Sequence, residues 1–198
     1  MTGVSAITSP APAGDLDAVV LVEGLSDQAA LSTLAKRRGR DLAAEKVSVV
    51  AMGGATNIGH FLTEYGPQGR NVRLAGLCDA AEERSFRRGL ERAGVGSAPD
   101  RAGLERLGFF VCTADLEDEL IRALGVAGVE QVIESQDELS SLRRFQLQPA
   151  QRGRPPQAQL RRFLGTRSGR KIAYGSLLVR ALDLDQVPRP LDGVLTFL

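Results

Sequence analysis

The sequence predicts an α/β fold in which a parallel sheet of about four strands is flanked by helices and followed by a helical C-terminal region. Two observations carry this prediction. Four short apolar runs lie within the first 115 residues, and each is followed by a helical pattern. After residue 125 the apolar runs give way to helix-like segments. Alternating strands and helices at this spacing are typical of a parallel sheet with helices packed on it.

The four apolar runs predict the strands in order along the chain. They are "AVVLVEG" (18–24), "KVSVVAM" (46–52), "NVRLAGLCD" (71–79) and "LGFFVCTAD" (107–115). Helices are predicted after them at 26–39, 55–66, 80–94 and 116–125. In the first helix we expect Ser26 as the N-cap and Gly39 as the stop, because these residue types favour those positions.

The chain divides into three parts by composition. Residues 1–15 are rich in Ala, Pro, Gly and Ser and are expected to form a flexible tail. Residues 16–125 form the predicted α/β core. Residues 126–198 form a mostly helical extension that packs on the core, with helices expected at 129–149, 157–165 and 168–182.

Bulk composition excludes several classes of protein. The 198 residues are 43% hydrophobic, which suits one globular domain with a substantial core. The net charge of +1 gives no overall preference for nucleic acid, so a nucleic-acid surface must be a local basic patch. No apolar stretch approaches the roughly 18 residues of a membrane span, so no membrane partner is expected.

The cysteines and the histidine give further limits. Cys78 and Cys112 end apolar runs, which predicts buried reduced thiols and a cytoplasmic protein rather than a disulfide framework. The single histidine, His60, excludes a histidine cluster and a Cys/His zinc site. We expect His60 to be a partly buried structural residue.

Carboxylates follow three of the predicted strands. The carboxyl ends of parallel strands share one rim of the sheet, where ligands bind. Glu23 ends the first strand, the Gly53–Gly54 pair follows the second, and Asp79 ends the third. Residues 113–115, which include Asp115, end the fourth. Asp27 lies one helical turn after Glu23, so both side chains can face one point. Hard oxygen ligands of this kind suit Mg²⁺ or Mn²⁺.

A simpler explanation applies to some of these acids. Asp and Glu are favoured in the first turn of any helix through capping and the macrodipole. Glu82, Glu83 and Asp118, each taken alone, are better explained as helix caps. Glu23 ends a strand before a turn glycine and cannot be explained in this way. The metal prediction therefore depends on the joint pattern.

Three motifs together resemble those of a Toprim domain, the catalytic fold of topoisomerases, bacterial primases and overcoming-lysogenization-defect (OLD) nucleases. They are "VEGLSD" (22–27), "GGATN" (53–57) and "LCDAAEE" (77–83). The acid-bearing "DLEDEL" (115–120) and the basic "SGRKIAYGSLL" (168–178) are most similar to the OLD branch. The resemblance covers about residues 17–182 and implies a Toprim-like fold.

The resemblance implies roles for individual residues. Glu23 corresponds to the general acid/base and a metal contact, Asp79 to the main metal-binding aspartate, and Lys171 to a catalytic cation near the scissile phosphate. Metal ligands would also come from Asp27 and Glu117. Gly53, Gly54 and Arg170 are the expected phosphate-binding residues, and Arg170 is the alternative to Lys171.

Two departures from the family pattern bear on activity. The third motif usually contains Asp-x-Asp, and Ala81 stands at the second aspartate. Glu83 or its neighbour Glu82 is expected to substitute as a metal ligand; otherwise one metal is weakened or lost. The chain also lacks a phosphate loop of the G-x-x-x-x-G-K-[ST] type, whereas full-length OLD nucleases carry an ATPase domain. Any ATPase would then come from a partner chain.

The predicted function is a two-metal endonuclease that cleaves DNA, or RNA, with Mg²⁺ or Mn²⁺. Three arginine doublets are candidate backbone contacts, with solvated helix faces as the equal alternative. They are Arg87, Arg88, Arg143, Arg144, Arg161 and Arg162. Three rivals stay open: a Toprim nucleotidyltransferase or RNA-processing enzyme, a catalytically silent binding module, and, ranked lowest, a response-regulator-like α/β protein. The sequence leaves a homodimer open.

Overall fold

The computed structural model describes residues 15–167 and 169–198, and a four-stranded sheet forms its centre. Its strands are β1 (Ala18–Val22), β2 (Val47–Ala51), β3 (Arg73–Cys78) and β4 (Phe109–Val111). They lie in the order β2-β1-β3-β4, and every pair is parallel. The predicted parallel sheet is confirmed. The predicted tail, except for residue 15, lies outside the described residues.

Successive residues of β1 contribute to two separate hydrophobic cores. Val19 and Leu21 belong to one core, whereas Val20 and Val22 belong to the other. This is the expected alternation of side chains across a strand whose two faces are both covered. All five β1 residues are buried, which explains why the run is apolar throughout.

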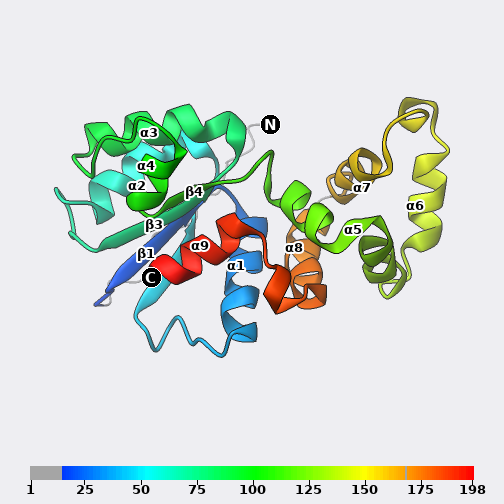
Figure 1. Cartoon of the computed structure of the whole chain (residues 1–198), viewed down its shortest axis with the longest axis horizontal. Coiled ribbons are helices and arrows are strands. Elements are labelled where there is room, and N and C mark those ends of the chain that lie inside the picture. Colours follow the sequence, from blue (N-terminus) through cyan, green and yellow to red (C-terminus); the bar gives the residue numbers. More distant parts are fainter. Residues whose placement is uncertain (1–14, 168) are drawn as a thin grey trace, which may run out of the picture.

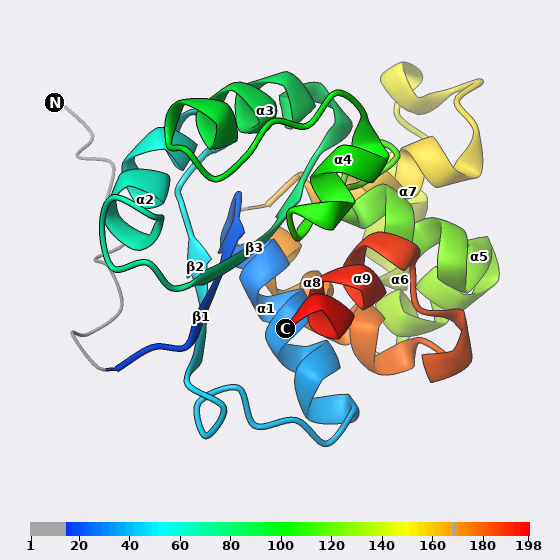
Figure 2. The same cartoon turned by 60° about the vertical axis from the view of Figure 1, so that its left-hand side comes forward.

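One face of the sheet is covered by helices from the middle of the chain (Figures 1 and 2). They are α2 (Ile58–Tyr65), α3 (Glu83–Arg92) and α4 (Arg101–Arg106). Short 3₁₀ turns, Ala55–Asn57 and Ala80–Glu82, precede α2 and α3. Buried aromatic rings fill this core, with Phe86 packed edge-on against Phe109 of β4.

The opposite face is covered by helices from both ends of the chain. They are α1 (Leu25–Arg37), α8 (Arg170–Ala181) and α9 (Arg189–Phe197). Helices α1 and α8 cross closely at Gly175, where a Cβ atom would lie 2.7 Å from the Ser26 carbonyl oxygen. The crossing therefore requires glycine on α8, and it brings the start of α8 to the carboxyl end of β1.

The remaining helices extend away from the sheet (Figure 1). They are α5 (Leu116–Glu134), α6 (Leu139–Gln146) and α7 (Pro156–Leu164). Their buried residues belong to the same hydrophobic cluster as β1, α1 and α8. Two further 3₁₀ turns lie between helices: Pro149–Gln151 between α6 and α7, and Leu184–Gln186 between α8 and α9. The helical region thus packs on the α/β part through a continuous core.

Several element boundaries differ from the sequence prediction. Helix α1 begins at Leu25 with Gly24 as its N-cap, so the assignment of Ser26 as the cap is wrong. The predicted strand 107–115 forms only three residues of β4. The helix expected at 116–125 continues to Glu134, with a kink at Gly125, where φ is 69°. Within the described residues, no helix is long and apolar enough to cross a membrane.

Candidate functional site

The candidate site lies at the carboxyl edge of the sheet. Glu23 directly follows β1 and Asp79 directly follows β3. These strands are neighbours in the sheet, so the two acids emerge side by side at its centre. Repulsion from Glu23 is one of the causes that raise the pKa of Asp79, which places the two carboxylates in one electrostatic environment.

Asp27 points back from the first turn of α1 towards the end of β1. It is only 8% exposed, and its Oδ2 accepts a hydrogen bond of 2.8 Å from the Gly24 N–H. Burial raises the pKa of Asp27 to about 6, and repulsion from Glu117 and Glu23 adds to this effect. The hydrogen bond from Gly24 opposes the shift without cancelling it.

Asp79 and Glu23 are also harder to ionise than ordinary carboxyl groups. Burial raises the pKa of Asp79 to about 7, with repulsion from Glu23, Asp27 and Asp115 acting in the same direction. Burial likewise raises the pKa of Glu23, and the neighbouring Glu82 adds repulsion. A bound cation would remove much of this repulsive free energy.

Helices α5 and α8 bring an acid and a base to the same rim. Glu117 is 4% exposed, and its Oε2 lies 3.0 Å from the Nζ of Lys171. Burial raises the pKa of Glu117 although Lys171 opposes the shift. Burial disfavours the charged form of Lys171, yet attraction from Glu117 and Asp27 outweighs burial and raises the Lys171 pKa. Lys171 is therefore a permanent cation within the acidic cluster.

Asp115 is a cluster member that the sequence placed at the rim but to which no role was assigned. Its Oδ1 accepts the Asp118 N–H at 2.9 Å as the N-cap of α5, while its Oδ2 accepts from Arg161 Nε at 2.7 Å. It also repels Asp79, Glu23 and Glu117. Its position at the end of the last predicted strand is the signal that placed it at the rim. We name Glu23, Asp27, Asp79, Asp115 and Glu117 the rim cluster.

The carboxylate oxygens of the rim cluster are suitable ligands for a hard divalent cation, but they do not lie close enough together to surround one. Glu23 Oε2 and Glu117 Oε1 are buried without a hydrogen-bond partner. A buried carboxylate oxygen without a partner is costly unless an ion satisfies it. Within residues 15–167 and 169–198, no group of three Asp, Glu, His or Cys side chains is close enough to hold a metal. Metal binding would therefore require the carboxylates to rotate inwards.

Two predicted site residues have other roles. Both carboxylate oxygens of Glu83 are paired with arginines, Arg87 and Arg101. Arg170 is 6% exposed, and its guanidinium pairs with Glu138 at 2.8 Å and stacks on the Phe163 ring. In this structure both side chains are therefore paired with other residues, and the roles of Glu83 as a metal ligand and of Arg170 as a phosphate contact stay predictions. Sequence position alone does not specify the direction of a side chain.

The Gly53–Gly54 turn lies beside β1 at the same edge. Both residues have positive φ, 70° and 127°, which only glycine adopts at low cost. The Gly54 N–H donates to the Glu23 carbonyl oxygen at 3.1 Å and so links the turn to the rim. A Cβ atom at Gly54 would meet no heavy atom within 4 Å, so the backbone is open to a ligand there.

Ala81, at the departure from the family pattern, is exposed. Glu82 is the adjacent acid whose charge acts on Glu23, whereas Glu83 is occupied by arginines. Of the two predicted substitutes for the missing aspartate, only Glu82 stays available.

The remaining sequence-level candidates lie away from the rim or are inert. His60 is exposed and packs edge-on against Phe61 at 5.3 Å, so the prediction of a partly buried histidine is wrong. Cys78 and Cys112 are free and buried, as predicted. Burial raises the pKa of both thiols, which keeps them protonated.

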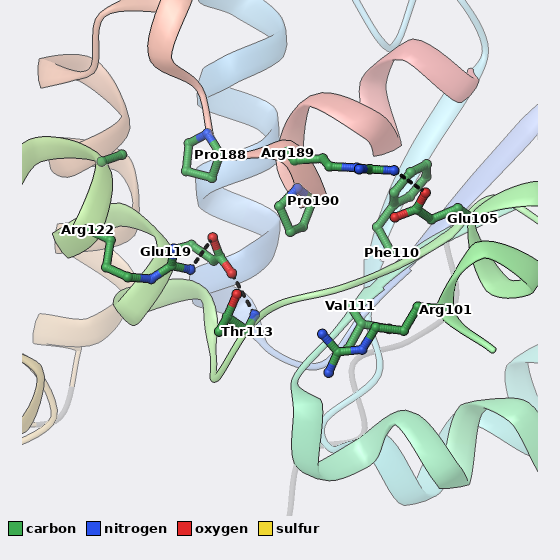
Figure 3. A pocket seen from close by; sticks show the side chains of 11 residues that line it. Arg101, Glu105, Phe110, Val111, Thr113, Glu119, Arg122, Pro188, Arg189 and Pro190 are labelled. Carbon is green, nitrogen blue, oxygen red and sulfur yellow. Dashed lines mark hydrogen bonds and ion pairs between the residues drawn. The ribbon is translucent and has the colours of Figure 1, made fainter.

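A second hollow of about 420 Å³ lies beside β4 and α9 (Figure 3). Its arginines are matched by acids: Arg122 pairs with Glu119 and Arg189 with Glu105, each at 2.6 Å. Glu119 also accepts the Thr113 N–H at 2.6 Å. Because its positive charges are already neutralised, this hollow is a weak candidate for binding an anionic ligand.

The chain resembles known proteins in part of its sequence. A domain family described as overcoming lysogenization defect protein-like, TOPRIM domain, matches residues 16–73. No curated protein gives a significant match.

Two solved structures share the fold over nearly the whole chain. The C-terminal region of the Xanthomonas campestris pv. campestris OLD protein is 22% identical, with a TM-score of 0.70 over 92% of this chain and 94% of that one. The C-terminal region of the Burkholderia pseudomallei OLD protein is 21% identical, with a TM-score of 0.68 over 93% of this chain and 97% of that one. Residues 16–73 are therefore similar to OLD-like Toprim domains, and the chain has the fold of the C-terminal region of OLD proteins.

Proposed function

We propose that the protein is a Mg²⁺- or Mn²⁺-dependent endonuclease that hydrolyses phosphodiester bonds in DNA. The likeness of residues 16–73 to OLD-like Toprim domains supports a role in nucleic-acid metabolism, and Toprim domains in general bind divalent metals. The observation that carries the finer proposal is the rim cluster itself. Acids from three separate segments face one lysine, and two of their buried oxygens have no partner.

The rim cluster fits a hard cation by the chemistry of its donors. Glu23, Asp27, Asp79 and Glu117 would hold the metal, with Asp115 and Glu82 as neighbouring acids. When bound, the metal would polarise the phosphate and lower the pKa of a water molecule.

The chain's own residues supply the rest of the chemistry. Lys171 Nζ neutralises negative charge that develops on the phosphate oxygens. Glu23 Oε2, which has no partner in the fold, accepts or returns the proton of the attacking water. The open Gly53–Gly54 turn allows the phosphate to approach the backbone closely. Because Glu23 Oε2 is buried in this fold, the proton step also requires its carboxylate to rotate towards the substrate.

A catalytically silent nucleic-acid-binding module is the second candidate. The observation that favours it is Ala81, which cannot supply a ligand where the family pattern has an aspartate. Under this alternative the rim cluster binds a single cation without turnover. An RNA-processing or nucleotidyl-transferring enzyme would use the same acids on another substrate.

The nuclease proposal predicts nicking of supercoiled plasmid by the purified protein with Mg²⁺ or Mn²⁺. Asp79→Asn is expected to lower the nicking rate by roughly two orders of magnitude, because the metal loses a charged ligand. The measurement is the rate of conversion to open-circular DNA on agarose gels, with RNA tested in parallel. Glu91→Gln, on the exposed side of α3, is the matched control and should retain the wild-type rate. Absence of nicking by the wild type, or equal nicking by Asp79→Asn, would refute the proposal.

A further inference from the structure

A cleft of about 480 Å³ opens directly beside the rim cluster. One wall carries Asp115, Glu117 and Lys171. The opposite wall is formed by α7 and the turn before it, with Arg154, Arg161 and Arg162. We name this hollow the α7 cleft. Members of the rim cluster and arginines thus line the same cleft.

The arginines of the α7 cleft differ in whether they form an ion pair with an acid. Arg161 is held by Asp115, with an Nε–Oδ2 distance of 2.7 Å. Arg154 donates only its Nε, to the Ala150 carbonyl oxygen at 2.9 Å. Within the described part of the chain, neither Arg154 nor Arg162 forms an ion pair with an acid, and both are exposed. Two guanidinium groups in the cleft therefore have donors free for an anion.

In the other arginine doublets one member is paired with an acid. Arg87 pairs with Glu83, and Arg143 pairs with Glu130 through two hydrogen bonds of 2.7 Å. Their neighbours, Arg88 and Arg144, do not line the α7 cleft. The arginines of the hollow beside β4 also have acidic partners. The α7 cleft thus combines contact with the rim cluster and arginines without acidic partners.

We propose that the α7 cleft binds the DNA backbone beside the scissile bond, with Arg154 and Arg162 contacting its phosphates. Arginine suits this role because its planar donors match phosphate oxygens. The placement also answers an electrostatic problem. The rim cluster repels a polyanion, and two cations on the facing wall offset that repulsion next to the reacting phosphate. The inference rests on the proposed function and adds to it the position of the substrate strand.

The test measures binding separately from cleavage. Anisotropy of a fluorescein-labelled single-stranded DNA is recorded in EDTA, so that no strand is cut, over a series of KCl concentrations. Arg162→Ala is expected to weaken binding roughly threefold or more, and to make the slope of log K against log salt shallower by about 0.7. The Arg154→Ala/Arg162→Ala double variant should lose about twice that slope.

Arg180→Ala is the matched control, since Arg180 is an exposed arginine on α8 that does not line the cleft. It should bind DNA as the wild type does, and thermal melts of all variants should coincide. Wild-type affinity and slope for the double variant, or no binding by the wild type, would overturn the cleft proposal. Tighter binding of an RNA strand, with the slope change confined to RNA, would overturn the assignment to DNA.

The two proposals fail in different ways. If the wild type binds DNA and Arg162→Ala shows the shallower slope, but no plasmid is nicked, the nuclease proposal fails and the phosphate-binding cleft stands. If plasmid is nicked and the double variant binds normally, the cleft proposal fails and the nuclease stands.

Discussion

At the scale of single residues, Asp27 combines two opposing roles. Its carboxylate accepts the Gly24 N–H and so stabilises the beginning of α1. The same carboxylate is buried beside Glu117 and Glu23, which makes its charge costly. A residue needed only as a cap would not require a full charge. The charge is therefore better explained by a ligand than by the fold.

Asp27→Asn is expected to stabilise the metal-free protein, because asparagine keeps the acceptor for Gly24 and removes the buried charge.

The folded-state pKa values of Asp27, about 6, and Asp79, about 7, lie above the ordinary 3.8. Between pH 3.8 and about 7 the folded state therefore binds more protons than the unfolded state. The free energy of unfolding falls as the pH rises through this range. The free energy of unfolding in EDTA should be lower at pH 8 than at pH 5.

The gain from Asp27→Asn at pH 8 is expected to be on the order of 3 kcal/mol, and smaller at pH 5. Urea unfolding followed by circular dichroism measures both. Added Mg²⁺ should raise the melting temperature of the wild type more at pH 8, where the rim cluster is ionised. Glu91→Gln should leave the pH dependence unchanged. Wild-type stability that rises between pH 5 and pH 8 would contradict the account.

The sequence was sufficient to identify residues that end strands, and only partly sufficient for residues on helices. Asp27, Glu117 and Lys171 lie at the rim as expected, whereas Glu83 and Arg170 are paired with other side chains. Glu23 and Asp79 have their direction fixed by the ends of parallel strands, so the rim position follows from the apolar runs alone. Glu83 and Arg170 lie on helices, where the partner decides the direction of a long side chain. Their partners, Arg101 and Glu138, are distant in sequence and have no recognisable pattern.

At the scale of elements, the kink in α5 separates two halves of one helix that contact different parts of the protein. The first half carries Glu117 to the rim, and the second half packs among α6 and α7. Gly125 at the kink has φ 69° and ψ 167°. The sequence predicted a helix end at this glycine and a further helix from residue 129, and the structure joins the two as α5 across the kink. Glycine marks the interruption, and tertiary packing decides whether the chain resumes a helix beyond it.

Gly125→Ala is expected to destabilise the protein by about 1 kcal/mol or more, because alanine pays a steric cost at positive φ. Gly128→Ala, three residues later in regular helix, is the matched control. A Cβ atom there would make only ordinary contacts at 3.4 Å, so alanine should stabilise by up to about 1 kcal/mol. Urea unfolding measures both. Equal effects of the two substitutions would show that the kink carries no backbone constraint.

Elements whose hydrophobic periodicity is weak were not predicted from the sequence. Helix α4 has only six residues, and its N-cap is Asp100, whose Oδ1 accepts the Gly103 N–H at 2.7 Å. Its apolar face contributes a single fully buried leucine, Leu104, so periodicity is almost absent. Helix α9 was included only within a general helical region. Long apolar strands were predictable because burial on both sides requires a continuous apolar run.

At the scale of the whole molecule, one face of the sheet is completed by the last helices of the chain. Leu191, Val194 and Leu195 of α9 are buried in the same core as Val20 and Phe110. Gly193 allows α9 to lie against the Phe110 ring, where a Cβ atom would overlap it. The α/β part and the helical part are therefore not independent in their packing.

Leu191→Ala is expected to destabilise the whole protein by about 2–5 kcal/mol, because it leaves a cavity at a fully buried position. Leu147→Ala is the control, since Leu147 is 72% exposed and should change stability by less than about 1 kcal/mol. A single cooperative transition in both variants would reflect the shared core. Selective loss of the C-terminal helices, with the sheet still folded in Leu191→Ala, would contradict it.

The order of synthesis separates the two partners of the ion pair between Lys171 and Glu117. The ribosome adds the acids Glu23, Asp27, Asp79 and Glu117 to the chain before it adds Lys171. A nascent chain that stops before Lys171 thus carries these acids without the lysine that pairs with Glu117. In such a chain the buried Glu117 carboxylate would lack its countercharge until α8 is made.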